Sequence, residues 1–176
     1  MSTPAQYRLA NRRRLHGGRL LNTPPDDHPG VIASPPFLYG AAFLVGSLLH
    51  WSFPKSVLPL DIAPWAGVSL LSCGAMLAVW SRRTLESAGT NVNPSLSATT
   101  LVVTGPFGFS RNPMYLARTL LYLGLGLLVN GLGLLLVLAP LLVVMHYGVI
   151  RREEHYLEAK FGEAYRQYRT GVRRWL

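Results

Sequence analysis

Two apolar segments, residues 114–129 and 132–150, are separated only by the dipeptide Asn130-Gly131. Asn-Gly is a turn dipeptide, so the chain is expected to reverse its direction between the two segments. The pattern therefore predicts a helical hairpin. Its open end would bring together two polar clusters that are far apart in the sequence, residues 105–115 before the hairpin and residues 151–154 after it.

Four apolar runs occur in the chain, and each is near the lower end of the roughly 17 to 25 residues that a helix needs to cross a bilayer. None contains an acidic residue, and Arg118 carries the only full positive charge inside them. Helices of a soluble bundle, the alternative, would carry polar stripes, which residues 132–144 lack. We therefore predict an all-α, polytopic membrane protein with about four transmembrane helices. The expected spans are residues 37–53, 63–80, 114–129 and 132–150.

Basic residues flank the predicted spans on one side. Of the 17 Lys and Arg residues, only Lys55 falls on the opposite side, in the loop 54–62. The positive-inside rule then places both termini, the loop 81–113 and the region 151–176 in the cytoplasm. This distribution explains the net charge of +9 without a nucleic-acid partner, and it favours contact with anionic membrane lipids. We expect a multi-pass protein of the bacterial inner membrane.

The chain is expected to divide into a basic cytoplasmic N-terminal segment, residues 1–35, and a membrane domain, residues 36–176. The polar stretch 84–113 is long for a connection, and its aromatic and Gly-Pro content predicts an ordered loop that forms a wall or lid of a site. After the last span, apolar residues recur at helical spacing. They predict a C-terminal amphipathic helix on the membrane, interrupted at Gly162.

The signatures of several soluble enzyme classes are missing from the sequence. The pair Gly124-Leu-Gly126 lacks the third glycine of a dinucleotide fingerprint, and neither a phosphate loop nor a two-histidine metal spacing occurs. The single cysteine, Cys73, cannot form an internal disulfide, and we expect it to be a buried small residue. Any chemistry must therefore use the two polar clusters, and no metal is expected.

Closure of the hairpin would place Arg111 and Tyr115 beside Glu153 and Glu154. A carboxylate pair near arginines is most often a solvated helix end. Here, however, both signs of charge meet against an apolar wall, which suits a zwitterion with an apolar part. S-adenosylmethionine has this character. Arg111 can hold its carboxylate, either glutamate can hold its ammonium, and aromatic side chains can face its adenine.

Two further residues of the hairpin are of interest. Tyr147 shares a helix face with Glu154 at helical spacing, so it is expected at the same site. Arg118 lies within the third span, where an ionisable residue is a functional candidate by default. The alternative for Arg118 is that its long side chain extends back to the membrane surface.

An ordered set of motifs in residues 90–176 resembles the isoprenylcysteine carboxyl methyltransferase and phospholipid methyltransferase group of integral membrane enzymes. The set comprises Gly-Pro-Phe, Arg-Asn-Pro-Met-Tyr, a hydrophobic hairpin, Glu-Glu, a tyrosine-containing helix and a terminal Arg-Trp-Leu. The group's signature is Arg-His-Pro-x-Tyr followed by Glu-Glu. Asn112 stands in place of the histidine and cannot titrate near neutral pH. The signature matches Arg111, Pro113, Tyr115, Glu153 and Glu154.

The resemblance implies an S-adenosylmethionine-dependent methyltransferase. Its cofactor pocket would lie at the cytoplasmic membrane face, and a lipophilic acceptor would enter from the bilayer. The acceptor would be the carboxylate of an isoprenylcysteine-like or other small lipid, or a phospholipid amine. The implied catalytic residues are Arg111, Tyr115 and Glu154. The implied cofactor-binding residues are Gly105, Pro106, Arg111, Asn112, Pro113, Tyr115, Tyr147, Glu153 and Glu154.

Two alternatives differ in class from this reading. One is a nicotinamide-dependent membrane reductase of a sterol-like or polyprenyl-like substrate, and the shortage of Lys and Arg in residues 84–110 disfavours it. The other is a non-enzymatic membrane scaffold, in which the polar ends of the hairpin only anchor lipid headgroups.

Overall fold

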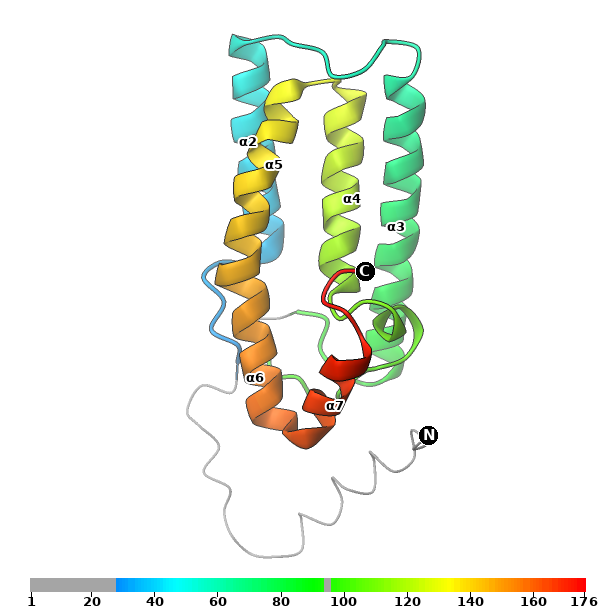
Figure 1. The fold of residues 1–176 in the computed structure, drawn as a ribbon, viewed down its shortest axis with the longest axis vertical. Coiled ribbons are helices and arrows are strands. Elements are labelled where there is room, and N and C mark those ends of the chain that lie inside the picture. The colour runs from blue at the N-terminus through cyan, green and yellow to red at the C-terminus, as the bar shows by residue number, and fades with distance from the viewer. Residues whose placement is uncertain (1–27, 94–95) are drawn as a thin grey trace, which may run out of the picture.

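The computed structural model describes residues 28–93 and 96–176, so most of the expected N-terminal segment lies outside the described residues. The described part is all-helical and contains no strand, as predicted (Figure 1). Its elements in chain order are α2 (Pro35–Ser52), α3 (Ala63–Ser87), the 3₁₀ turn η2 (Gly105–Gly108), α4 (Pro113–Leu128), α5 (Leu132–Met145), the π-helical turn η3 (His146–Ile150), α6 (Arg151–Phe161) and α7 (Glu163–Gly171).

Two of these helices are long and apolar enough to cross a membrane. They are α3 and the continuous helix Leu132–Phe161, which comprises α5, η3 and α6. α4 is apolar but shorter, and α2 does not meet the same criterion, so the count of four spans stays a prediction. Only 17% of the apolar window of α3 is buried. A core helix of a soluble protein would be mostly buried, whereas this exposure suits contact with lipid.

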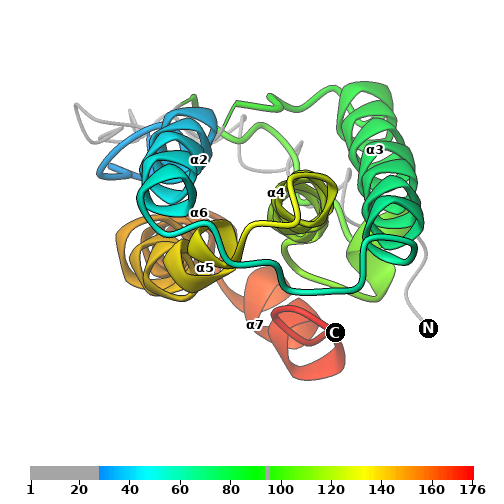
Figure 2. The same cartoon turned by 90° about the horizontal axis from the view of Figure 1, so that it is seen from above.

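Glycine residues set the closest helix contacts in the bundle. α3 packs along α4 (Figure 2), where a Cβ atom on Gly67 would lie 2.9 Å from the carbonyl oxygen of Gly124. α2 packs along α5, where a Cβ atom on Gly133 would lie 2.8 Å from the carbonyl oxygen of Gly46. Small residues allow such an approach of two backbones. Cys73, which we expected to be buried, is exposed, because the neighbouring Gly74 takes the position that faces α4.

Hydroxyl groups on α4 tie this helix to α2 and α5. The Tyr122 hydroxyl donates to the carbonyl oxygen of Leu134 at 3.0 Å, and the hydroxyls of Tyr39 and Thr119 lie 2.8 Å apart. These groups have no water to bond with inside an apolar bundle, so their pairing removes a large desolvation cost. α4 thereby lies between α3 on one side and the pair of α2 and α5 on the other, as Figure 2 shows from above.

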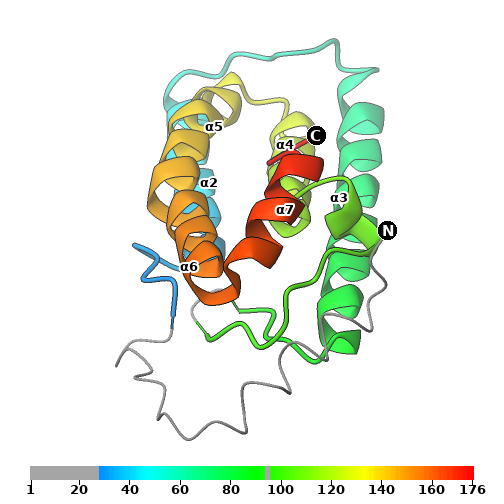
Figure 3. The same cartoon turned by 60° about the horizontal axis from the view of Figure 1, so that its bottom comes forward.

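The turn at Asn130-Gly131 reverses the chain between α4 and α5, as the sequence predicts. Asn130 has a φ of 51°, and its Oδ1 accepts the backbone N–H groups of Val57 and Leu58 at 2.9 and 3.0 Å. From this turn the two helices diverge toward the end that carries α6 and α7 (Figures 1 and 3). The hairpin is therefore splayed, and its open end leaves room for a site.

The C-terminal region folds back under the bundle. The expected interruption lies at Gly162, whose φ of 56° is unfavourable for residues with a side chain and ends α6. α7 then returns toward α4, and the last residues lie beside the start of α4 (Figure 3). The chain end thus meets the polar cluster that precedes the hairpin.

Candidate functional site

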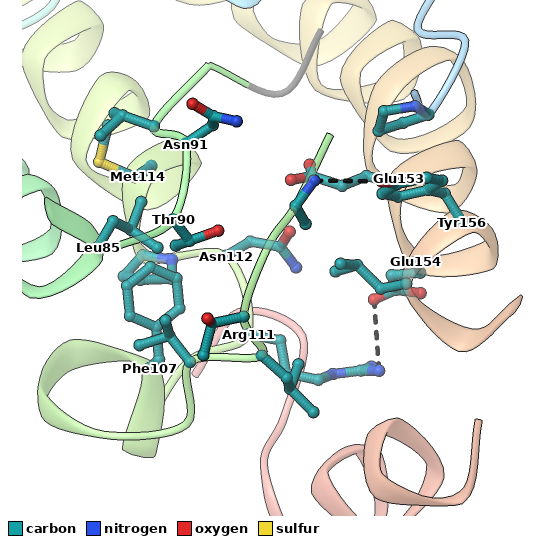
Figure 4. A pocket seen from close by; sticks show the side chains of 18 of the residues that line it. Leu85, Thr90, Asn91, Phe107, Arg111, Asn112, Met114, Glu153, Glu154 and Tyr156 are labelled. Atoms are coloured by element: carbon teal, nitrogen blue, oxygen red, sulfur yellow. Dashed lines mark hydrogen bonds and ion pairs between the residues drawn. The ribbon is translucent and has the colours of Figure 1, made fainter. Parts of the chain in front are cut away.

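A cavity of about 110 Å³ lies at the open end of the hairpin (Figure 4). The residues around it come from the end of α3, the loop 90–102, the start of α4, α6 and α7. The loop that we expected to form a wall does line it. Most of the lining is apolar or aromatic, and the charged side chains in it are Arg111, Arg118, Glu153 and Glu154.

Arg111 has a largely buried side chain at this cavity. Its side chain is 9% exposed, and its Nη1 lies 3.4 Å from Oε1 of Glu154. Neither Nε nor Nη1 has a hydrogen-bond partner among the residues that the structure describes. Buried polar groups are nearly always paired, and an unpaired buried donor costs roughly 1 to 3 kcal/mol. These two donors therefore mark a position where an acceptor from a ligand would be stabilising.

Glu154 is already neutralised by the protein itself. Its residue surface is 9% exposed, and Arg174 donates to it through Nε at 2.9 Å and through Nη2 at 2.7 Å. This is the two-pronged geometry in which a guanidinium matches a carboxylate best. The hydrogen bonds of Glu154 raise the pKa of the Arg174 guanidinium. Arg111 lies on the other side of Glu154, which therefore has two cationic neighbours. Its oxygens are largely engaged and have few positions left to accept from a ligand.

Glu153 is in a different environment. It is half-buried and accepts a hydrogen bond from the Tyr115 hydroxyl at 2.7 Å. Burial raises the pKa of the Glu153 carboxyl, while the Tyr115 hydrogen bond and the charge of Arg118 oppose the rise. The two adjacent glutamates are therefore unequal, since guanidinium groups enclose Glu154 and a phenol holds Glu153.

The turn before α4 is fixed by the end of the chain. The backbone N–H of Arg111 donates to the carbonyl oxygen of Arg173 at 2.9 Å. The Asn112 side-chain amide donates to the carbonyl oxygen of Arg174 at 3.1 Å, and the Ser110 hydroxyl donates to the same oxygen at 3.3 Å. Asn112 is buried, so its amide serves here as a structural donor.

The loop 90–102 is attached to α6 by a tyrosine. The Tyr156 hydroxyl accepts the backbone N–H of Ala98 at 3.1 Å and a hydrogen bond from Lys160 at 2.9 Å. Within the loop, Thr99 donates its backbone N–H to the hydroxyl of Thr90 at 3.1 Å. These bonds hold an irregular segment against the cavity, where Figure 4 shows Tyr156 across from Thr90.

The structure brings most of the predicted site residues together. Arg111, Asn112, Pro113, Tyr115, Glu153 and Glu154 all line the cavity.

Three predicted residues do not line the cavity. Gly105 and Pro106 belong to η2, where Gly105 faces the Thr84 side chain instead. Tyr147 is 59% exposed, and its ring meets that of His146 edge to face. The π turn explains this position. In η3 the N–H of Arg151 bonds to the carbonyl of His146, five residues earlier, so the α-helical spacing from Tyr147 to Glu154 does not hold.

Sequence reasoning missed four side chains of the site. Tyr156, Tyr165 and Tyr168 line the cavity, and Arg174 holds Glu154. The helical spacing of Tyr165 and Tyr168 was noticed, but only as an amphipathic pattern. Their burial raises the pKa of both phenols, that of Tyr165 to about 12. Arg174 belongs to the terminal Arg-Trp-Leu motif, but the spacing of the motifs does not indicate its contact with Glu154.

A sequence model of phospholipid methyltransferases matches residues 62–164, more than half of the chain. The chain belongs to the phospholipid methyltransferase family. The match covers the helices from α3 to α6, including both polar clusters of the cavity. It confirms the resemblance found in the sequence. Together with the two long apolar helices, family membership indicates association with a membrane.

The chain is similar to one curated protein over a short segment. This relative is an uncharacterized protein of Haemophilus influenzae, 54% identical over 35 residues. The aligned segment is 20% of this chain and spans about half, 56%, of the length of that relative. No solved structure matches the chain.

Proposed function

We propose that the protein is an S-adenosylmethionine-dependent methyltransferase that acts at the membrane on a lipophilic acceptor. The observation that carries this proposal is that two buried Arg111 donors, Nε and Nη1, have no hydrogen-bond partner among the described residues, although Nη1 has an ion pair with Glu154, at a cavity that contains carboxylates. A ligand with an amino-acid end supplies the missing acceptor for Arg111 and a cation for a carboxylate. The family match supports the same reading.

The residues of the cavity fit S-adenosylmethionine part by part. Arg111 would hold the carboxylate of its amino-acid end, because a guanidinium donates to a carboxylate with high directionality. Glu153 would hold the ammonium group, since both oxygens of Glu154 already accept from Arg174. Aromatic wall residues such as Phe107 and Tyr156 would face the adenine. When bound, S-adenosylmethionine supplies an activated methyl group on a sulfonium.

The protein's own contribution would consist mainly of positioning and of water exclusion. Tyr115 donates to Glu153 and so fixes the orientation of that carboxylate. Residues 90–93 and 96–102, attached through Tyr156, line one wall of the cavity and would limit the access of water to a bound ligand. A carboxylate acceptor needs no base. For an amine acceptor, Glu153 is the carboxylate that would take the proton, because burial raises its pKa and both oxygens of Glu154 already accept from Arg174.

The membrane arrangement belongs to the same proposal. α2 and α4 would cross the bilayer beside α3 and α5, with both termini in the cytoplasm and the cavity at the cytoplasmic face of the bacterial inner membrane. The predominance of basic residues at that end supports this orientation. The splayed hairpin supports entry of the acceptor from the bilayer, since its open end lies where α4 begins (Figure 1).

Calorimetric titration of the detergent-purified protein with S-adenosylmethionine, and separately with NADPH, tests the function. We expect saturable binding of S-adenosylmethionine and none of NADPH. The substitution Arg111→Gln should weaken this binding at least about tenfold, because a charge-assisted pair is lost. The matched control is Arg83→Gln, an exposed arginine of α3 outside the cavity. Binding of NADPH alone, or equal affinity in the Arg111→Gln variant, would reject the proposal.

A further inference from the structure

Arg118 is a cation inside the apolar part of α4. It lies five residues after Pro113, where the helix begins, so it sits roughly 8 Å along the axis. A charged side chain at such a depth is costly in a bilayer and is retained where it has a partner or a function. Its side chain lines the same cavity as Tyr115 and Glu153.

The protein gives this guanidinium little compensation. Arg118 forms no hydrogen bond and no salt bridge with the residues that the structure describes. The hydroxyl of Tyr115 is used by Glu153, and that of Tyr39 is used by Thr119. The one direct contact recorded for the cation is with the Tyr115 ring, whose centroid lies 5.6 Å from its Cζ. A contact of this kind is weaker than the pairing of a guanidinium with an anion.

The position of Arg118 argues against a purely structural role. A side chain that only extends to the membrane surface would leave the cavity. Arg118 instead lies over the ring of Tyr115 and lines the cavity, and its charge is felt by Glu153. Arg111 provides a second guanidinium closer to the chain end, with Glu154 as its neighbour. The cavity therefore has two guanidinium groups in different positions. That of Arg111 lies at the turn before α4, and that of Arg118 lies within the helix.

We propose that Arg118 binds the anionic headgroup of the lipophilic acceptor, a carboxylate or a phosphate on a hydrocarbon tail. This inference rests on the proposed function, since it assigns the second reactant of the same cavity. A guanidinium presents a planar fork that matches both kinds of oxyanion, and Arg118 presents it inside the cavity, five residues into the apolar helix α4. Arg111 and Glu153 remain available for the other ligand.

Three probes with the same sixteen-carbon tail test this assignment, namely palmitate, hexadecyl phosphate and hexadecanol. Their binding is measured by calorimetry on the full chain in a non-ionic detergent. The variants are Arg118→Gln, Arg118→Lys and the exposed control Arg83→Gln. For Arg118→Gln we expect at least a tenfold loss of affinity for the anionic probe that the wild type binds, and no change for hexadecanol. Arg118→Lys should keep part of the affinity, because it retains the charge without the fork.

The two wild-type anion titrations distinguish a carboxylate acceptor from a phosphate-bearing lipid. Equal affinity of the wild type and Arg118→Gln for both anions would overturn the assignment. S-adenosylmethionine is titrated into the same samples. Thermal unfolding of Arg118→Gln at the temperature of the wild type shows that the variant is folded. Failure of S-adenosylmethionine to bind the wild type would reject the proposed function, while the anion titrations would still decide the role of Arg118.

Discussion

Arg174 holds Glu154 with two hydrogen bonds, 2.9 Å from Nε to Oε1 and 2.7 Å from Nη2 to Oε2. This pair joins the segment that follows α7 to the first turn of α6. The carbonyl oxygens of Arg173 and Arg174 meanwhile accept from Arg111 and Asn112, so the chain end is fixed on both sides of the cavity. Glu154 therefore acts chiefly as an anchor for the elements that shape the site.

Replacement of Arg174 should destabilise the protein and loosen the site. In Arg174→Ala, Glu154 would lose both forked hydrogen bonds and keep only the longer contact with Arg111. We expect a loss of about 1 to 3 kcal/mol, below the value for a fully buried pair because Arg174 is partly exposed. Thermal unfolding and S-adenosylmethionine titration measure the two effects. The control is Arg173→Ala, which removes an exposed side chain and keeps the backbone carbonyl, so parallel behaviour of the two variants would contradict this role.

The environment of Glu153 predicts a specific pH dependence of stability. Burial raises its pKa in the folded state above the ordinary value of 4.5, so the folded protein holds this proton more tightly than the unfolded chain does. Its contribution to stability is then largest at low pH and is lost as the pH rises from 4.5 through the raised pKa. Glu153→Gln should remove this loss. The melting temperature of the variant should therefore rise relative to that of the wild type as the pH increases.

The control for this experiment is Glu163→Gln, since Glu163 lies on the surface and pairs only with Arg166 of the same helix. Melting curves of the three proteins between pH 4 and pH 8 provide the comparison. An identical pH profile for the wild type and Glu153→Gln would contradict the assigned environment.

The glycine contact between α3 and α4 should be sensitive to a single methyl group. A Cβ atom on Gly67 would lie 2.9 Å from the backbone oxygen of Gly124, and a backbone atom cannot rotate away. Gly67→Ala should therefore force the helices apart and cost about 1 to 3 kcal/mol. Gly40→Ala on α2 is the matched control, because no atom lies within 4 Å of its Cβ position. Alanine there should be neutral or slightly stabilising in thermal unfolding.

Much of this arrangement follows from local sequence signals. The Asn-Gly turn and the two flanking polar clusters were sufficient to bring Arg111 and Tyr115 to Glu153 and Glu154. The helices α3, α4 and α5 begin within one residue of the predicted span starts. Two helices continue beyond the predicted span ends. α3 extends to Ser87, where an ion pair of 2.7 Å joins Arg82 and Glu86 at helical spacing, and the helix that begins at Leu132 continues to Phe161.

The missed features depend on non-local or irregular geometry. The π turn at His146–Ile150 has no simple sequence signature, and it moved Tyr147 away from the face of Glu154. The contact of Arg174 depends on the reversal at Gly162, whose consequence for the chain end cannot be derived from spacing. Gly105 and Pro106 lie close to Arg111 in the sequence, but η2 turns them toward α3.

Tyr156 and Tyr147 offer a final comparison, because both tyrosines flank the start of α6 and only one lines the cavity. Tyr156→Phe keeps the ring but removes the hydroxyl that accepts from Ala98, so the loop 90–102 should open more often. The loss of about one hydrogen bond should weaken S-adenosylmethionine binding several-fold, by roughly 1 kcal/mol. Hydrogen exchange of the Ala98 region should also become faster.

Tyr147→Phe should change neither quantity, because Tyr147 is mostly exposed. Weaker binding in Tyr147→Phe with unchanged binding in Tyr156→Phe would instead return Tyr147 to the cofactor site.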